Sequence, residues 1–315
     1  MRVVVTGASG FVGGDAVRWL RARGHEVIPC GRRPASRLQR PITGYVSWDL
    51  RRDRPDLPDV DAVVHCAAHV GDSADDPAFQ ATNVDGLNNL LAWLPAAARL
   101  VHVSSASVYD LESPLVQVRE DAPYGSGHLN AYSRTKIAAE RILLASGRPV
   151  TILRPHTIYG PGDTHLLPGL LRASRFGVLP MYGDGTNLLS VTHVENLSRA
   201  IECAIDPAAP SGIYNITDDG HAPLDEILRT LLRRLGVNPR VAYIPRAVAW
   251  PAAGLVDALP AALRGRGDRM LSRFLVSHMS KEFTMSTEHA RTRLGYAPRW
   301  TFRDGPLSGY SGDLD

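Results

Sequence analysis

The amino-acid sequence predicts an α/β fold, a doubly wound parallel sheet with a smaller, mostly C-terminal lobe. Two observations carry this prediction. Short apolar runs alternate with helical patterns through the first half of the chain, and parallel strands need helical crossovers, which this spacing supplies. After residue 160 the alternation weakens and Pro and Gly become frequent, which is typical of a smaller lobe of helices and loops.

The first strand and the first helix are predicted from their residue types and from the spacing of their apolar residues. Val3, Val4 and Val5 form a β-branched run that stops at a glycine turn, as expected of a buried strand. Residues 15–23 follow with an apolar face at helical spacing. The same reasoning predicts strands over 25–30, 61–65, 100–104 and 150–153, and helices over 84–94 and 131–145.

Two late runs, residues 189–192 and 212–216, have strand composition, and we expect both to return to the sheet. The chain therefore divides into two parts. Residues 1–160 and 188–218 are predicted to form the nucleotide-binding domain, and residues 161–187 and 219–315 the substrate-binding lobe.

Composition excludes several classes of protein. The 315 residues carry a net charge of +3 without a dense Lys/Arg run, which argues against nucleic acid or an anionic membrane as partner. Cys30, Cys66 and Cys203 are widely spaced and odd in number, as a reducing cytosol tolerates. A strand begins directly after Met1 and leaves no room for a signal peptide. We expect a cytoplasmic protein.

Residues 242–263 form the most apolar late stretch of the chain. It is interrupted by Pro245, Pro251 and Pro260 and contains the charged residues Arg246 and Asp257. A membrane-spanning helix needs about 20 uninterrupted apolar residues. We expect no stable membrane insertion. The segment is interpreted as a cover over an apolar pocket, with peripheral membrane contact as the alternative.

A glycine-rich turn joins the first strand to the first helix. Gly7, Gly10 and Gly13 suit a tight turn, close approach of a diphosphate and close helix–strand packing. The helix N-terminus then offers unpaired N–H groups to phosphates. In this context the turn predicts a Rossmann-type dinucleotide site, with contacts from Gly7, Ser9, Gly10, Phe11, Val12 and Gly13.

The residue that ends the second strand bears on the choice of nicotinamide cofactor. An NAD site usually has a carboxylate there, which holds the ribose hydroxyls. This chain has Gly31 followed by Arg32 and Arg33, so a 2′-phosphate meets no like charge and two guanidinium groups could hold it. We expect NADP in preference to NAD, with two solvated surface arginines as the alternative interpretation.

Three side chains form the predicted catalytic group. Tyr132 and Lys136 are four residues apart on an expected helix, so their side chains share one face. A neighbouring ammonium and an oxidised nicotinamide both lower the pKa of a phenol. Ser105 lies where the strand over 100–104 ends, at the carboxyl edge of the sheet, where open α/β sheets bind ligands.

On these motifs the chain resembles the extended short-chain dehydrogenases/reductases, the superfamily of nucleotide-sugar epimerases and 3β-hydroxysteroid dehydrogenases. The resemblance covers nearly the whole chain and implies an enzyme that acts through Ser105, Tyr132 and Lys136. Ser105 is chosen because it precedes Tyr109 by four residues, as the family's active serine or threonine does, and Ser104 and Ser107 remain alternatives. The resemblance also implies a homodimer.

The resemblance implies further contacts to the cofactor. Asp49 and Leu50 would border the adenine, and Ala67 and Ala68 would line the diphosphate. The remaining implied cofactor residues are Asn83, Val103, Pro155, Thr157 and Ile158.

Two departures argue against a nucleotide-sugar substrate. Members that bind such substrates commonly have an Asn where this chain has Thr157, and an Arg-Asp pair where it has Leu189-Ser190. The motifs around Arg154 and Leu294 resemble instead the 3β-hydroxysteroid dehydrogenase and sterol-4-carboxylate 3-dehydrogenase branch. We expect hydride transfer to or from a secondary alcohol or ketone of an apolar small molecule, which Ser107, His156 and Leu189 would contact.

Alternative functions are a nucleotide-sugar epimerase or dehydratase that retains its cofactor, and a non-catalytic NADP-sensing regulator. His65 and His69 are four residues apart but not on a helix, and no third ligand is apparent, so we expect no metal site. The alternative to a substrate contact by His156 is that its ring packs within the protein or anchors a loop. His193 and Glu195 are interpreted as structural.

Overall fold

A computed structural model describes residues 1–38, 40–52, 55–71, 77–127, 130–174, 177–258 and 271–308. Its centre is a seven-stranded parallel sheet in the order β12-β7-β5-β4-β1-β2-β3. The strands are β1 (Arg2–Thr6), β2 (Glu26–Gly31), β3 (Val46–Ser47), β4 (Ala62–His65), β5 (Arg99–Val103), β7 (Val150–Pro155) and β12 (Gly212–Ile216). The order runs outward from β1 in both directions, as in a doubly wound Rossmann-type fold.

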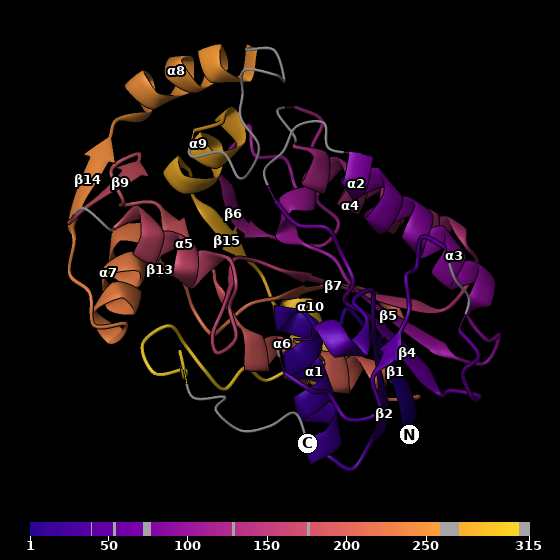
Figure 1. Ribbon diagram of the computed structural model, residues 1–315. Helices are drawn as coiled ribbons and strands as arrows, with labels where there is room; N and C mark the ends of the chain where they lie inside the picture. The colour runs from indigo at the N-terminus through magenta and orange to yellow at the C-terminus, as the bar shows by residue number, and fades with distance from the viewer. Residues whose placement is uncertain are drawn as a thin grey trace.

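Helices cover both faces of this sheet (Figure 1). On one face lie α1 (Phe11–Ala22), α6 (Val194–Ile205) and α10 (Glu288–Leu294), and on the other α3 (Gly86–Trp93) and α4 (Ala131–Ala145). Because side chains alternate along a strand, Val3 and Val5 of β1 pack with the first group and Val4 with the second. This two-sided burial explains why β1 is a continuous valine run.

Short elements connect the main ones. They are η1 (Ala35–Arg37), α2 (Pro77–Phe79), the π-helical turn η2 (Gln80–Asp85), η3 (Ala106–Val108) and β8 (Ile158–Tyr159), which pairs with β11 (Thr192–His193). The π-helical turn leads directly into α3 and packs on α4.

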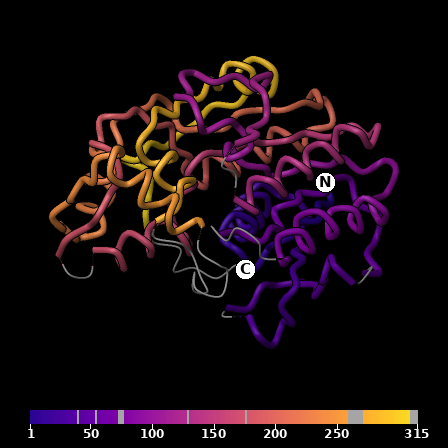
Figure 2. The backbone as a smooth tube through the Cα atoms, turned by 90° about the horizontal axis from the view of Figure 1, so that it is seen from above, coloured from indigo at the N-terminus to yellow at the C-terminus, as the bar shows by residue number. Residues whose placement is uncertain are grey.

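The second half of the molecule surrounds a smaller core of its own. A four-stranded sheet in the order β13-β10-β15-β6 contains β13 (Ala222–Pro223), β10 (Leu188–Leu189), β15 (Phe283–Met285) and β6 (Leu115–Val118), and β9 (Val178–Tyr182) pairs with β14 (Arg240–Ile244). The helices are α5 (Leu166–Ala173), α7 (Leu224–Arg234), α8 (Arg246–Ala258) and α9 (Arg273–Ser280). Figure 2 shows the orange-to-yellow segments of this part beside the indigo N-terminal segments of the chain.

The structure confirms the predicted fold class, and most elements agree closely with their expected ranges. The helix over 131–145 agrees at both ends. Asn130 caps its N-terminus, the side chain accepting from Ser133 N at 2.8 Å, and at its C-terminus the Ser146 hydroxyl donates to the Leu143 carbonyl at 2.6 Å. The prediction for 189–192 was wrong: β10 belongs to the smaller sheet and β11 pairs with β8, so neither joins the central sheet.

The domain boundaries stay a prediction, and strand pairing crosses them. Residues 115–118 and 188–189, expected in the nucleotide-binding domain, pair within the sheet of the second half. Residues 259–270 and 309–315 of the expected lobe lie outside the described residues. Among the described helices, none has both the length and the apolar composition needed to span a membrane.

Candidate active site

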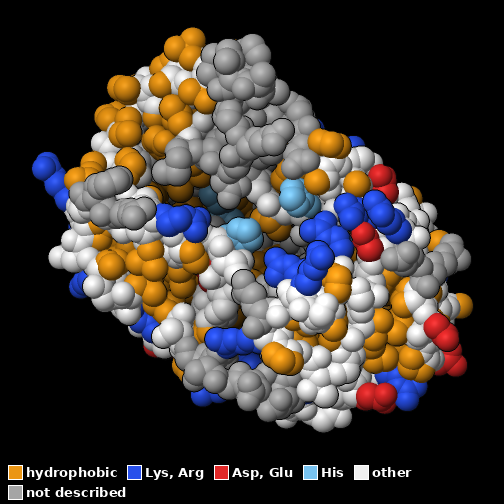
Figure 3. Space-filling view, in the orientation of Figure 1, with side chains coloured by type: hydrophobic (Ala, Val, Ile, Leu, Met, Phe, Trp, Pro, Cys, Tyr) orange, Lys and Arg blue, Asp and Glu red, His pale blue; other side chains and the backbone are white. Residues whose placement is uncertain are grey.

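A cavity of about 970 Å³ opens at the carboxyl edge of the central sheet and continues into the second half of the molecule. Figure 3 shows a hollow on this face, with histidine side chains at its mouth and a group of Lys and Arg side chains on one flank. Ligands of open α/β sheets bind at this edge, so the cavity is the candidate active site.

The glycine turn forms one wall of the cavity and tolerates no side chain at two positions. Gly7 has φ of +72°, and a Cβ there would lie 2.8 Å from Ala67 N. A Cβ on Gly13 would lie 2.3 Å from the carbonyl oxygen of Gly7. No side chain caps α1 at Gly10, so its first N–H groups are available to a phosphate. The turn therefore fits a dinucleotide cofactor.

Gly13→Ala is expected to destabilise the protein by about 1–3 kcal/mol through overpacking and to weaken cofactor binding, since the turn must move. Gly169→Ala is the matched control, because Gly169 is also helical and a Cβ there meets nothing within 4 Å. Thermal unfolding and the Kd of NADPH measure both effects. If Gly13→Ala and Gly169→Ala had the same unfolding temperature and the same Kd of NADPH, the tight packing at Gly13 would be contradicted.

The flank of the cavity near β2 and β3 carries positive charge. Gly31, Arg32 and Arg33 line it as predicted, and Arg32 and Arg33 are exposed. Sequence reasoning missed Arg51, which lines the same flank and bonds Asp49 through two nitrogens at 2.6 and 2.9 Å. The hydrogen bonds and charge of Arg51 hold the pKa of Asp49 below its usual value.

Helix α4 places Lys136 in a buried position. Its Nζ donates to the carbonyl of Val103 at 2.7 Å. Burial lowers the pKa of Lys136 to about 8, and the nearby Glu140 carboxylate opposes that shift. Glu140 is itself bound by Arg154 (2.6 Å) and by the hydroxyls of Ser104 and Tyr124.

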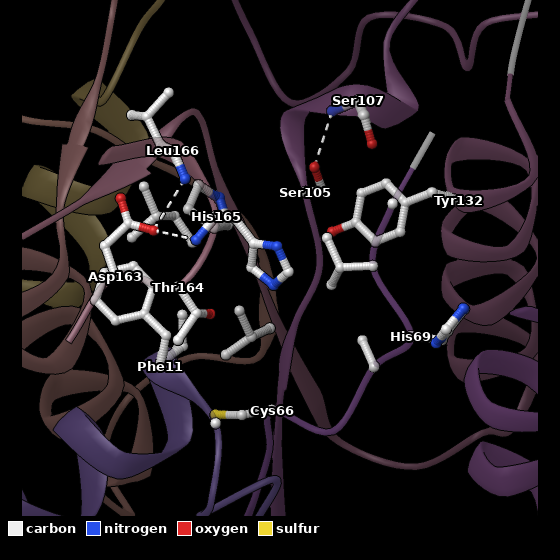
Figure 4. Close-up of a pocket in the computed structure, with 18 of the residues that line it drawn as sticks. Phe11, Cys66, His69, Ser105, Ser107, Tyr132, Asp163, Thr164, His165 and Leu166 are labelled. Carbon is white, nitrogen blue, oxygen red and sulfur yellow. Dashed lines mark hydrogen bonds between the residues drawn. The ribbon is translucent and has the colours of Figure 1, made fainter. Parts of the chain in front are cut away.

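Tyr132 lies one helical turn before Lys136, with its hydroxyl directed towards Ser105 (Figure 4). Burial raises the pKa of Tyr132, and a hydrogen bond with Ser105 opposes the rise. The spacing of Tyr132 and Lys136 had predicted that Lys136, together with an oxidised nicotinamide, lowers this pKa. Within the part of the chain that the structure describes, Ser105 is the side chain that acts in that direction.

The three serines of this segment have different surroundings. Ser105 Oγ accepts from Ser107 N at 3.1 Å and faces Tyr132. Ser104 is buried, and its hydroxyl is engaged by Glu140. Ser107 also lines the cavity, and its buried hydroxyl has no partner among the described residues. The structure thus brings Ser105, Tyr132 and Lys136 together.

The other predicted residues, with one exception, line the same cavity. They are Gly7, Ser9, Gly10, Phe11, Val12, Gly13, Asp49, Leu50, Ala67, Ala68, Val103, Pro155, Thr157, Ile158, His156 and Leu189. Asn83 is the exception: its amide is bound to the backbone of His69 (2.7 and 3.1 Å) and to Thr135 Oγ1. Asn83 therefore fixes the loop after β4 and does not line the described cavity.

The far half of the cavity is apolar. Its lining comes from α5, α7, α9 and neighbouring strands and consists of Leu166, Leu170, Met181, Leu189, Val191, Leu224, Ile227, Leu228, Leu231, Phe274, Leu275 and Met279. Sequence reasoning missed α7, although its leucines recur at helical spacing. Residues 242–258 of the expected cover do not line the cavity themselves. Helix α8 packs instead on Leu275 and Met279 of α9, which border the cavity, and residues 259–263 lie outside the described residues.

His156 and His278 are in contact where the part of the cavity next to the glycine turn adjoins the apolar part. His156 Nδ1 lies 2.5 Å from the carbonyl of Ser190, which only accepts, so Nδ1 carries the proton. Its Nε2 then accepts from His278 Nε2 at 3.2 Å. Burial lowers the pKa to about 3 for His156 and about 4 for His278, so this pair is uncharged. Among the described residues no cluster suits a metal ion.

Comparisons with known proteins agree with this geometry. The fold and the cavity are those of a Rossmann-type dinucleotide-binding protein. Residues 3–217 match the NAD dependent epimerase/dehydratase family, so the chain belongs to that family, the extended short-chain dehydrogenases/reductases. It is an enzyme of a family that uses a nicotinamide cofactor.

Relatives with similar sequences span most of the chain. A "2-alkyl-3-oxoalkanoate reductase" of Stenotrophomonas maltophilia is 32% identical, over 97% of each chain. A "4-hydroxy-2-methyl-3-oxo-4-farnesyl-3,4-dihydroquinoline-1-oxide ketoreductase" of Stigmatella aurantiaca is also 32% identical, over 97% of this chain and 94% of its own. The human "sterol-4-alpha-carboxylate 3-dehydrogenase, decarboxylating" is 32% identical over 78% of this chain and 69% of its own. The resemblance to the hydroxysteroid dehydrogenase branch is thereby confirmed.

Among solved structures, MoeE5 in complex with UDP-glucose and NAD is similar, with a TM-score of 0.72, 28% identity and coverage of 97% of this chain and 96% of that one.

Proposed function

We propose that this enzyme transfers a hydride reversibly between NADP(H) and a ketone or secondary alcohol of an apolar molecule. One observation carries the proposal: a single cavity joins the glycine turn, the Ser105–Tyr132–Lys136 group and an extended apolar lining. A bound nicotinamide supplies or accepts the hydride in this reaction. The protein supplies the remaining contributions.

Each catalytic side chain has one role in this proposal. In the direction of reduction, Tyr132 Oη donates its proton to the carbonyl oxygen of the substrate, and Ser105 Oγ donates a hydrogen bond to the same oxygen. Lys136 holds the ribose next to the nicotinamide and stabilises the phenolate that the proton transfer leaves. In the direction of oxidation, the phenolate accepts the proton.

The substrate is proposed to carry a hydrocarbon chain. Twelve apolar side chains line the far half of the cavity, and transfer of apolar surface from water into such a lining is favourable. The named substrates of the Stenotrophomonas and Stigmatella relatives, an alkyl oxoalkanoate and a farnesyl quinoline, both carry such chains. A screen of lipophilic ketones and alcohols beside sugar nucleotides, followed by absorbance of the reduced cofactor, tests the proposal.

A nucleotide-sugar epimerase or dehydratase that retains its cofactor is the second candidate, because MoeE5 is a structural neighbour with UDP-glucose bound. The site supports it less. Leu189 lines the cavity, and the Ser190 hydroxyl is turned into the protein, where it accepts from Met285 N at 3.1 Å. Neither can give a diphosphate the charge-assisted bonds that an arginine gives.

UDP and dTDP are therefore expected not to inhibit reduction of a lipophilic ketone at millimolar concentration, whereas lipophilic alcohols compete. Steady-state inhibition with each compound checks this expectation. Inhibition by UDP in the micromolar range, or copurified cofactor without net turnover, would favour the epimerase or dehydratase instead.

A further inference from the structure

His165 lies in the loop between β8 and α5, opposite the catalytic helix. The Asp163 carboxylate accepts from the backbone N–H groups of His165 (2.7 Å), Leu166 (3.0 Å) and Leu167 (2.8 Å). These bonds fix the first turn of α5. Figure 4 shows the Asp163 carboxylate on the far side of the loop, while the His165 imidazole projects across the cavity towards the Tyr132 hydroxyl.

The other histidines that line the described cavity are committed to the protein. His156 and His278 are bonded to each other, and burial keeps both uncharged. The His69 ring packs edge-on against Phe79, with ring centroids 4.5 Å apart. His165 differs because it is exposed within the cavity. Its ring is therefore available to a ligand.

The Lys and Arg side chains of the described lining are placed elsewhere. Arg32, Arg33 and Arg51 lie on the flank near β2 and β3. Lys136 is buried and donates to the Val103 carbonyl. Among the described lining residues, His165 is thus the basic side chain that faces Tyr132 from the substrate wall.

We infer that His165 binds a carboxylate of the substrate next to the reacting carbonyl, so that the substrate is an oxo acid with an aliphatic chain. This inference rests on the proposed function. Tyr132 and Ser105 take the carbonyl oxygen, His165 takes the carboxylate from the opposite wall, and the apolar half of the cavity takes the chain. An imidazole N–H bonded to a carboxylate is a charge-assisted hydrogen bond, stronger than one between neutral groups.

The first test compares 3-oxodecanoate with its methyl ester on the NADPH-loaded enzyme. The measured quantity is the ratio of kcat/KM for the acid to kcat/KM for the ester. His165→Ala is expected to lower this ratio about ten- to a hundredfold, and His165→Lys to restore part of it. Both variants keep the backbone N–H that Asp163 holds. His221→Ala is the matched control, because His221 is exposed and outside the cavity lining.

The second test measures binding without turnover. Calorimetric titration of the enzyme–NADP complex with decanoate and with decanol is expected to show a loss of decanoate affinity in His165→Ala that exceeds any loss for decanol. The binding measurement tests the role of His165 even if the enzyme reduces neither 3-oxodecanoate nor its methyl ester. Failure to reduce both compounds would refute the proposed function but would leave the role of His165 open to this measurement. An unchanged preference for decanoate overturns the inference. A higher Kd for NADPH in His165→Ala also overturns the inference, since the imidazole would then contact the cofactor.

Discussion

Tyr132→Phe is expected to lower kcat for ketone reduction by about 10²–10⁴-fold, because the substitution removes the proton donor and such groups usually contribute that much. The ring that remains keeps its edge-on contact with Phe79, and Lys136 keeps its bond to the Val103 carbonyl. The Kd of NADPH is therefore expected to change by about twofold at most. Single-turnover kinetics and fluorescence titration measure the two quantities.

Ser133→Ala is the control for Tyr132→Phe. Ser133 is the next residue of α4, buried and outside the cavity lining, and its hydroxyl has no partner among the described residues. It should retain nearly the full rate. If Tyr132→Phe keeps more than about a tenth of the wild-type kcat in a chemistry-limited assay, another group exchanges the proton.

The Kd of NADPH is expected to be about ten- to a hundredfold lower than the Kd of NADH. Each charge-assisted contact from Arg32 or Arg33 to the 2′-phosphate is worth about 1.5–3 kcal/mol, less the ordering of an exposed side chain. Arg51 adds positive charge to the same flank, although Asp49 is its partner. Arg32→Ala should remove much of the preference. Arg37→Ala, an exposed arginine outside the lining, is the control.

Reversing the preference needs a third substitution that only the structure reveals. A carboxylate at position 31, introduced by Gly31→Asp, would hold the free ribose hydroxyls of NAD. A Cβ on Gly31, however, would lie 2.6 Å from Tyr45 Oη and 3.2 Å from Ser9 Oγ. Tyr45 Oη is held there by donation to the Arg33 carbonyl at 2.9 Å.

Gly31→Asp with Arg32→Ala is thus expected to weaken both cofactors, and addition of Tyr45→Phe to favour NADH, because the phenylalanine keeps the ring and removes the clashing oxygen. Dissociation constants of NADPH and NADH at fixed salt compare the double and triple variants. Equal wild-type affinities for the two cofactors would show that the arginines point into solvent and would end the NADP proposal.

Local signals explain what could be predicted from the sequence. The valines of β1, the glycine turn and the pair Tyr132 and Lys136 each depend on neighbours within a few residues, so period and spacing were sufficient. The cavity lining agrees with this, since nearly all residues singled out from motifs lie in it. Asn83 was the exception because a motif does not state whether its side chain faces the ligand or the backbone.

Contacts between distant segments could not be predicted. Residues 189–192 have the composition of one strand, but the chain divides them between two different sheets. Tyr45 blocks position 31 only because the loop before β3 folds back on β2. His278 reaches His156 from 122 residues further along the chain. Such pairings depend on tertiary packing, which no local pattern encodes.

The apolar half of the cavity has a consequence for the evolution of this enzyme. Leu224, Ile227, Leu228 and Leu231 line the cavity and also belong to the hydrophobic core of the second half of the molecule. Truncating such a leucine to alanine costs about 2–5 kcal/mol of stability, a large part of the 5–15 kcal/mol that holds a typical domain folded. New substrate preferences on this scaffold therefore have to arise through exchanges of similar volume on α7, or after stabilising mutations elsewhere have made larger changes tolerable.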